Sequence, residues 1–380
     1  MDKTVSVIKC PDYDAKALDQ AVERHFQMLG LERLIRPQMK IVLKPNLLMK
    51  RRPEEATTTH PALMAAIIRK LKALGAAHIT IADSPGGPFT TGMLAGIYSA
   101  SGMERVAMEE GVALNQDTTA TTVSVEKNEQ IKQVDVITAI AKADLVINVC
   151  KLKAHGMMTL SGAVKNMFGV IPGLTKPEYH FRFPDPKDFG AMLVDVCEAA
   201  KPAVTFVDGI EAMEGNGPSA GQKKQVGLVL AGRSPYCVDL ALCYLTGLDP
   251  MELPSQTAAI GRGLSPASFA ELTVVGDALV PVEFIFPAGG KSLDFSSYVP
   301  QFLRPWARRL MTPKPVVRQP DCIGCGKCKE SCPVNTIAIE DKKARILDKK
   351  CIRCYCCHEM CPVKAIDLKR TFFMGIRGAE

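Results

Sequence analysis

Nine of the fourteen cysteines in this 380-residue chain lie between Cys322 and Cys361. Eight of them form two runs with one spacing, in which two-residue gaps separate the first three cysteines and a fourth follows after three residues, next to a proline. The runs are Cys322, Cys325, Cys328 and Cys332, and then Cys351, Cys354, Cys357 and Cys361. Thiolates this close in sequence can converge on one metal centre. The spacing therefore indicates metal binding rather than a disulfide framework.

The two runs belong to an internal repeat. The segment CIGCGKCKESCPVNTIAI at 322–339 recurs as CIRCYCCHEMCPVKAIDL at 351–368, displaced by 29 residues. The repeat resembles the bacterial two-[4Fe-4S] ferredoxins, in which the fourth cysteine of each run binds the other cluster. The resemblance implies two [4Fe-4S] clusters, which carry single electrons. It assigns one cluster to Cys322, Cys325, Cys328 and Cys361, and the other to Cys332, Cys351, Cys354 and Cys357.

Cys356 is the additional cysteine of the second run. If it replaced Cys357, the gaps would become one and four residues and the match with the first run would be lost. We therefore predict that Cys356 is not a cluster ligand. Cys-x2-Cys pairs also bind zinc, which is the alternative, although two duplicated four-cysteine runs followed by proline favour clusters.

The composition, with 47% hydrophobic and 23% charged residues, is typical of a globular protein. The net charge of +7 lies mostly after residue 312, where 14 Lys and Arg face 8 Asp and Glu. Such a basic segment can bind nucleic acid or a membrane surface. However, thiolate-bound clusters add negative charge, and the segment lacks interleaved aromatic and basic residues. We therefore expect no nucleic-acid partner.

The chain begins without a basic start followed by an apolar segment, and no apolar stretch approaches the roughly 20 residues of a membrane helix. We therefore expect a cytoplasmic protein without a membrane span.

Strand-like and helix-like patterns alternate through the first 286 residues. Helical patterns occur at 15–30, 61–75 and 188–201. Apolar runs typical of strands buried on both faces occur at 4–10, 40–46, 78–84, 145–151, 204–210, 226–232 and 272–277. This alternation predicts an α/β domain with a mostly parallel sheet flanked by helices.

We predict four segments in the chain. The α/β domain spans 1–286, and a proline-rich connector with the only tryptophan, Trp306, spans 287–318. A small α+β ferredoxin-type two-cluster domain spans 319–370, and a tail spans 371–380.

Polar and basic residues gather where several predicted strands end. Ligands of open α/β sheets bind beyond the carboxyl ends of the strands, so these loops are expected to share a pocket for an anionic substrate or cofactor. Ser161 is expected to cap a short helix whose free amides add to the anion site. The alternative is a set of solvated strand-end residues. The predicted binding residues are Lys44, Asn46, Lys151, Lys153, His155, Ser161, Lys165 and Asn166.

His60 and Asp83 are the candidate proton donors of this site. Each has a simpler explanation. His60 precedes a predicted helix, so its role can be simply that of a helix-entry residue. A carboxylate directly after a strand, such as that of Asp83, commonly forms a turn.

Five motifs of the larger domain resemble a known family. They are KPNLL at 44–48, THP at 59–61, DSPGG at 83–87, KLKAHGMMTLSGAVKNMFG at 151–169 and DGIEAMEGNGP at 208–218. They look like the domain-of-unknown-function 362 family, often fused to a C-terminal ferredoxin. The resemblance covers most of residues 1–280 and implies an architecture and a redox context, but no reaction.

We therefore predict an iron–sulfur redox protein, an oxidoreductase if it acts on a substrate. Its ferredoxin domain would relay single electrons between a redox partner protein and a small anionic substrate or cofactor on the α/β domain. One alternative is a non-catalytic electron carrier or assembly factor whose α/β domain docks a partner protein. Another is a nucleic-acid-binding protein with structural clusters, whose binding would depend strongly on salt.

Overall fold

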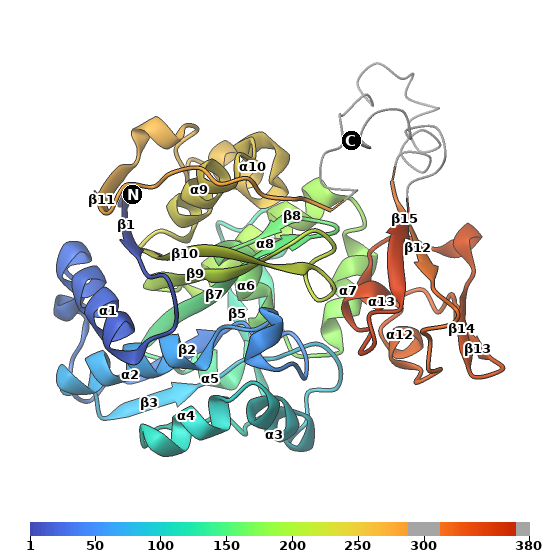
Figure 1. The fold of residues 1–380 in the computed structure, drawn as a ribbon, viewed down its shortest axis with the longest axis horizontal. Coiled ribbons are helices and arrows are strands. Elements are labelled where there is room, and N and C mark those ends of the chain that lie inside the picture. Colours follow the sequence, from blue (N-terminus) through green and yellow to red (C-terminus); the bar gives the residue numbers. More distant parts are fainter. Residues whose placement is uncertain (288–311, 370–380) are drawn as a thin grey trace.

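The computed structural model describes residues 1–287 and 312–369 (Figure 1). They form an α/β region, residues 1–287, and a smaller C-terminal region, residues 312–369. The predicted tail, Trp306 and most of the predicted connector lie outside the described residues. Among the described residues, no helix combines the length and apolar character needed to span a bilayer.

The α/β region is built on one sheet, which has nine strands among the described residues, in the order β11-β1-β10-β9-β7-β2-β3-β4, with β8 paired to β7. The neighbours β11–β1, β9–β7, β7–β2, β2–β3 and β3–β4 are parallel, whereas β10 is antiparallel to both its neighbours. The predicted mostly parallel sheet is therefore confirmed. The strands are β1 (Thr4–Lys9), β2 (Lys40–Pro45), β3 (His78–Ile81), β4 (Ala113–Leu114), β7 (Leu145–His155), β8 (Thr159–Ser161), β9 (Val204–Glu214), β10 (Gln222–Gly232) and β11 (Thr273–Gly276).

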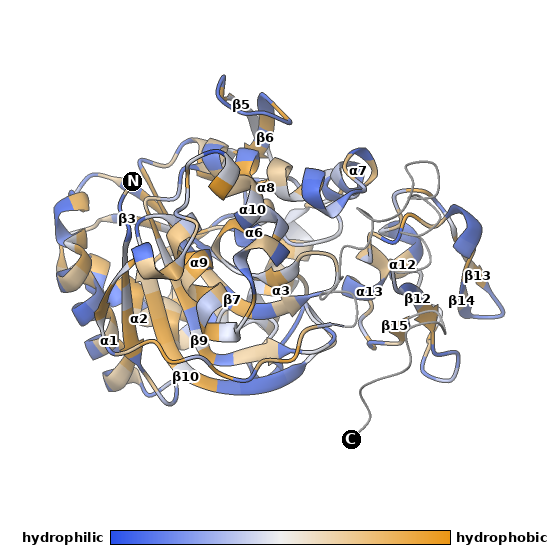
Figure 2. Cartoon of the chain, turned by 90° about the horizontal axis from the view of Figure 1, so that it is seen from above, coloured by the Kyte–Doolittle hydropathy of each residue, from blue (hydrophilic) through white to orange (hydrophobic). Residues whose placement is uncertain are grey.

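Helices cover both faces of this sheet. Ile41 and Leu43 of β2 pack with α1 to α4, whereas Val42 packs on the opposite face with α6 and α8, because successive side chains of a strand alternate. Apolar residues accordingly follow the central strands in Figure 2. The helices of this region are α1 (Ala15–Leu29), α2 (Pro61–Ala73), α3 (Thr91–Ala100), α4 (Met103–Glu109), α5 (Thr138–Ala141), α6 (Ala163–Met167), α7 (Thr175–Arg182), α8 (Pro186–Ala200), α9 (Pro235–Thr246) and α10 (Pro254–Gly261).

All seven predicted strands and the three predicted helices are present. Two of the strands extend beyond their apolar runs, β7 to His155 and β9 to Glu214, because they continue to pair with each other as far as Lys153 and Met213. The sequence patterns did not indicate the hairpin of β5 (Ala120–Ser124) and β6 (Gln133–Ile137), whose first strand is polar and exposed.

The C-terminal region has the predicted α+β character. Strand β12 (Lys314–Val317) pairs with β15 (Ile366–Lys369), and β13 (Ile337–Glu340) forms a hairpin with β14 (Lys343–Ile346). The short helices α12 (Lys327–Glu330) and α13 (Cys356–Glu359) occupy equivalent places in the two repeats. Residues 314–317, which the sequence patterns assign to the connector, therefore form part of the small domain's structure.

The C-terminal region lies against the α/β region on the side of α7 (Figure 1). The loop 215–221, which follows β9, contributes two contacts. Ser219 Oγ donates to the carbonyl of Glu359 at 2.9 Å, and His358 Nε2 lies 3.1 Å from the carbonyl of Asn216. From the loop after β2, the Arg51 guanidinium donates to the carbonyls of Cys361 and Pro362, each at 3.1 Å. The two regions thus meet beyond the carboxyl ends of the parallel strands.

Candidate functional site

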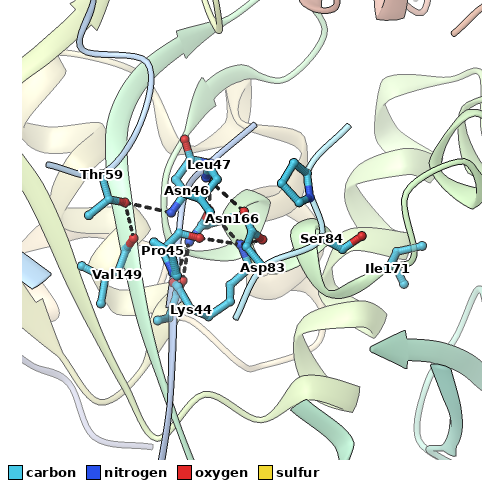
Figure 3. A network of polar contacts seen from close by, with 12 residues as sticks. Lys44, Pro45, Asn46, Leu47, Thr59, Asp83, Ser84, Val149, Asn166 and Ile171 are labelled. Carbon is cyan, nitrogen blue, oxygen red and sulfur yellow. Dashed lines mark hydrogen bonds and ion pairs between the residues drawn. The ribbon is translucent and has the colours of Figure 1, made fainter. Parts of the chain in front are cut away.

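The end of β2 carries a buried ion pair (Figure 3). Lys44, only 1% exposed, places its Nζ 2.7 Å from Asp83 Oδ1, and Asp83 Oδ2 accepts the backbone N–H of Leu47 at 3.0 Å. Burial lowers the pKa of Lys44, and the charge of Asp83 acts in the opposite direction. Further hydrogen bonds from Nζ to Pro45 O and Asn166 Oδ1 satisfy the ammonium group. The pair is therefore complete without a ligand.

Two asparagines connect this pair to the next strand. Asn46 Nδ2 donates to Asn166 Oδ1 at 2.9 Å (Figure 3). Asn166 Nδ2 in turn donates to Asn148 Oδ1 of β7 at 2.7 Å. Asn46 Oδ1 accepts from Lys153 Nζ at 2.6 Å. This network holds α6 against the ends of β2 and β7, so that neighbouring side chains keep fixed positions.

Lys153 and His155 lie at the end of β7, and each is 1% exposed. Burial, aided by the nearby Lys165 charge, lowers the pKa of Lys153 to about 7. His155 Nε2 lies 3.1 Å from Glu359 Oε1 of the C-terminal region. Burial lowers the pKa of His155 although Glu359 opposes this effect. These residues therefore bring the strand end into direct contact with the C-terminal region.

The short helix α6 begins differently from the prediction. Its N-cap is Gly162, and Ser161 makes no capping bond because it lies at the end of β8. The first amides, those of Ala163 and Val164, instead donate to the carboxylate of Asp239 on α9, at 2.6 and 3.0 Å. The predictions that Ser161 caps this helix and that its free amides bind an anion are therefore wrong.

These residues surround a cavity of about 110 Å³ between the two regions. Seven of the eight predicted binding residues line it, and so does Asp83. Sequence analysis missed Lys176 and His180 on α7, and Glu359 and Cys356 on α13. The predicted residues that line the cavity are Lys44, Asn46, Lys153, His155, Ser161, Lys165 and Asn166.

Lys151 and His60 lie outside this cavity. Lys151 Nζ lies 3.0 Å from Asp208 Oδ2 and donates to Tyr13 Oη at 2.8 Å. His60 stacks on the Tyr13 ring with 3.6 Å between centroids, and its Nδ1 accepts from the Ala62 amide as the cap of α2. The helix-entry explanation of His60 thus describes its contacts, and the structure does not bring it to Asp83.

The eight cysteines of the two runs line two small cavities of about 20 Å³ each. One set is Cys322, Cys325, Cys328 and Cys361, and the other is Cys332, Cys351, Cys354 and Cys357, accompanied by Cys356. A zinc ion at about 2.3 Å from four sulfurs fills the space between them, so a void larger than a water molecule suits a cluster better. Among the described residues, no three His, Cys, Asp or Glu side chains are placed to hold a single ion.

Backbone amides point at several of these sulfurs. The amide of Ala365 donates to Cys361 Sγ at 3.2 Å, and that of Ala344 donates to Cys322 Sγ at 3.3 Å. In the second set, Thr336 donates to Cys332 Sγ at 3.4 Å. Such hydrogen bonds stabilise thiolates and raise cluster potentials, so the surroundings of the sulfurs fit iron–sulfur clusters.

Comparison with known proteins agrees with both regions. The family described as "Domain of unknown function (DUF362)" matches residues 41–244, and a 4Fe-4S dicluster domain matches residues 314–362. A thylakoid-associated protein of Synechocystis sp. is 29% identical over 303 residues, which cover 76% of this chain and 92% of that protein.

Two solved structures show limited similarity. The lactate racemase apoprotein from Thermoanaerobacterium thermosaccharolyticum is 14% identical with a TM-score of 0.38, covering 63% of this chain and 57% of that one. A protein from Thermotoga maritima is 13% identical with a TM-score of 0.33, covering 53% and 51%. This chain thus spans little more than half the length of each.

Proposed function

The chain belongs to the DUF362 family and carries a 4Fe-4S ferredoxin-type domain with an iron–sulfur electron-transfer role, and from this premise we propose that it transfers single electrons to or from a small anionic molecule in the cavity between its two regions. A redox partner protein would exchange electrons with the ferredoxin domain. The protein would then be an iron–sulfur oxidoreductase.

One observation carries this proposal. Cys356, on α13, lines both the cavity of about 110 Å³ and the small cavity of Cys332, Cys351, Cys354 and Cys357. A molecule in the large cavity would therefore be separated from the second set of thiolates by little more than this side chain. Electron transfer favours such a short path.

We further propose two [4Fe-4S] clusters, held by the two cysteine sets that line the small cavities. A bound cluster supplies one-electron transfer at each site. Cys356 would remain a thiol beside the second set, in agreement with the spacing argument. Each set has one cysteine from the other run, Cys332 in the second set and Cys361 in the first. The two sites are therefore expected to form together.

The lysines of the large cavity would bind and neutralise the anion. Lys153, Lys165 and Lys176 line it from β7, α6 and α7. The ion pair of Lys44 and Asp83 would hold the surrounding loops, because both charges already have partners. His155, which lines the cavity, is better placed than His60 to donate a proton.

Native mass spectrometry of protein purified without oxygen tests this function. We expect the mass of two [4Fe-4S] clusters plus a small molecule, with the small molecule lost in Lys165→Gln and kept in Lys142→Gln, whose lysine is exposed and does not line the cavity. Two clusters without a bound molecule, in a protein that also binds no added anion, would favour the carrier or assembly-factor alternative.

A further inference from the structure

The cavity contains three lysines that lack a carboxylate partner. Lys44 is paired with Asp83, but Lys153, Lys165 and Lys176 form no ion pair with any described residue. Lys153 is buried, and Lys165 and Lys176 are half-buried in the cavity wall. Ammonium groups that are shielded from water without counter-charges are costly, so their positive charge requires compensation from elsewhere. The charge of a ligand is the simplest source.

Two of these lysines are held by neutral acceptors. Lys153 Nζ donates to Asn46 Oδ1 at 2.6 Å and to the carbonyl of Thr57 at 2.8 Å. Lys176 Nζ donates to the carbonyls of Ser84 and Ile171, each at 2.6 Å. Hydrogen bonds therefore fix both ammonium groups in place, while their charge stays unneutralised.

Lys165 is the least satisfied of the three. Its Nζ lies 4.9 Å from the centroid of the Phe168 ring, and no hydrogen bond joins it to a described residue. Desolvation is the main cause that lowers the pKa of Lys153 and of Lys176, and the charge of Lys165 lowers both pKa values further. Lys165 is therefore within electrostatic reach of both other lysines.

A buried histidine with an unpartnered ring nitrogen also lines this cavity. His180 is 3% exposed and lines the cavity, and its Nδ1 has no hydrogen-bond partner among the described residues. Buried polar atoms in native proteins nearly always have a hydrogen-bond partner, so the unpartnered Nδ1 points to a polar group on a ligand. This observation is independent of the lysine charges.

The charge balance indicates how many negative charges fit. Glu359 is the carboxylate that acts on Lys153 and Lys165, and it is already in contact with His155. The carboxylate that acts on Lys176 is Asp83, which is already paired with Lys44. Among the side chains, the pair of Lys44 and Asp83 is neutral, so three protonated lysines against Glu359 leave an excess of about two positive charges when His155 is neutral. One negative charge on a ligand would compensate only half of that excess.

We propose that the ligand is a small organic dianion, with Lys165 shared between an anionic group near Lys153 and another near Lys176. This deepens the proposed function and rests on it. Leu48, Met93 and Met360 also line the cavity, so the skeleton between the anionic groups is short and apolar. Two carboxylates, or a carboxylate and a phosphoryl group, share this chemistry.

Isothermal titration calorimetry on the cluster-loaded full chain, without oxygen, tests the charge requirement. The probes are malonate, succinate and glutarate, with monomethyl succinate as a monoanion of similar size and inorganic phosphate as the phosphoryl source. We expect the best dicarboxylate to bind about tenfold or more tightly than the monoester, since a charged hydrogen bond contributes that much. Phosphate binding more tightly than every dicarboxylate would identify the phosphoryl source.

Variants connect the preference to the lysines. Lys165→Gln should bring dicarboxylate affinity down to that of the monoester, and Lys142→Gln should leave it unchanged. Lys176→Gln is the second test if Lys165→Gln loses its clusters or its cooperative melting. Equal affinity for the monoester and the dicarboxylates would overturn the dianion inference but leave an anion site. Binding of no anion by intact, cluster-loaded protein would instead contradict the proposed function.

Discussion

The two proposed binding sites of this molecule are specified in different ways. Each cysteine set takes three of its proposed ligands from a run of seven residues, and only Cys332 and Cys361 come from the other repeat. The large cavity takes its residues from the ends of separate strands, from α6 and α7, and from α13. The cysteine sets form a local site, which residue spacing alone specifies. The large cavity is a distributed site, which depends on strand order and on the docking of the second region.

The largest expected effect concerns the local site. Cys354→Ser should remove one of two clusters, because the ligand comes from the motif itself, whereas Cys356→Ser should keep both. Iron and acid-labile sulfide per chain measure this after purification without oxygen. If Cys356→Ser loses as much iron as Cys354→Ser, then Cys356 is a ligand and the match between the two runs does not hold.

The next effect concerns the distributed site. Asp83→Asn leaves Lys44 buried without its counter-charge, which should lower the free energy of unfolding by about 3–5 kcal/mol. Asp19→Asn is the matched control, because Asp19 pairs with Arg69 at the surface, where its side chain is 46% exposed. We expect the control to lose about 0–1 kcal/mol. Urea unfolding of both variants measures the difference, and equal losses would show that the buried pair contributes no more than a surface pair.

Much of the distributed site could be predicted from the sequence. The carboxyl ends of parallel neighbouring strands meet at one edge, so Lys44, Asp83 and Lys153 were expected together, and the structure places all three at one cavity. The apolar runs suffice for this because strands buried on both faces are hydrophobic throughout. The prediction used strand positions alone and needed no knowledge of side-chain contacts.

The remaining residues required contacts between distant segments. Ser161 was expected to cap α6. Instead, the first amides of α6 donate to the carboxylate of Asp239 on α9, which is 76 residues away from Ala163 in the sequence. Lys151 alternates with Lys153 in sequence, yet the β7–β9 register shifts between them and Lys151 pairs with Asp208. Such partners cannot be read from local spacing.

Lys176 and Glu359 show two further limits. Lys176 lies in α7, which follows no strand, so the rule on strand ends does not reach it. Glu359 lies in the cysteine repeat and enters the cavity only because the two regions dock. No pattern within either region indicates this approach.

A third prediction uses pH to test the lysines of the distributed site. In the free protein, desolvation lowers the pKa of the buried Lys153 and that of the half-buried Lys176, each to about 7. A bound dianion favours the protonated forms and raises both values. Affinity for succinate, which is still largely a dianion at pH 6, should therefore be highest between about pH 6 and pH 7. It should fall above pH 7 by up to about tenfold per pH unit for each lysine that has lost its proton. The charges facing Lys153 are Lys165, Glu359, Lys151 and Lys44, and those facing Lys176 are Asp83, Lys44 and Lys165.

Calorimetry at pH 6, 7, 8 and 9 measures this dependence with the full chain. Buffers of different ionisation enthalpy should also reveal proton uptake on binding near pH 8. An affinity that stays constant from pH 6 to pH 9 would mean that these lysines do not take up protons with the ligand.

The smallest effect concerns the joint between the two regions. The loop 215–221 approaches the end of β7 so closely that a Cβ on Gly217 would lie 2.0 Å from the carbonyl oxygen of Ala154. From this fixed position Ser219 Oγ donates to the carbonyl of Glu359 at 2.9 Å. The loop therefore holds the helix that borders both the large cavity and the second cysteine set.

Ser219→Ala should remove this single buried hydrogen bond, at a cost of about 1 kcal/mol. Because the bond joins the two regions and lies within neither, we expect faster hydrogen exchange in residues 356–361 and unchanged exchange in β2 and β7. The control Ser124→Ala, on an exposed strand, should change neither. Unchanged exchange at 356–361 would mean that the other joint contacts, such as those of Arg51, hold α13 without the loop. Cluster content should stay constant in either case, because the cysteine spacing that specifies the local site is untouched.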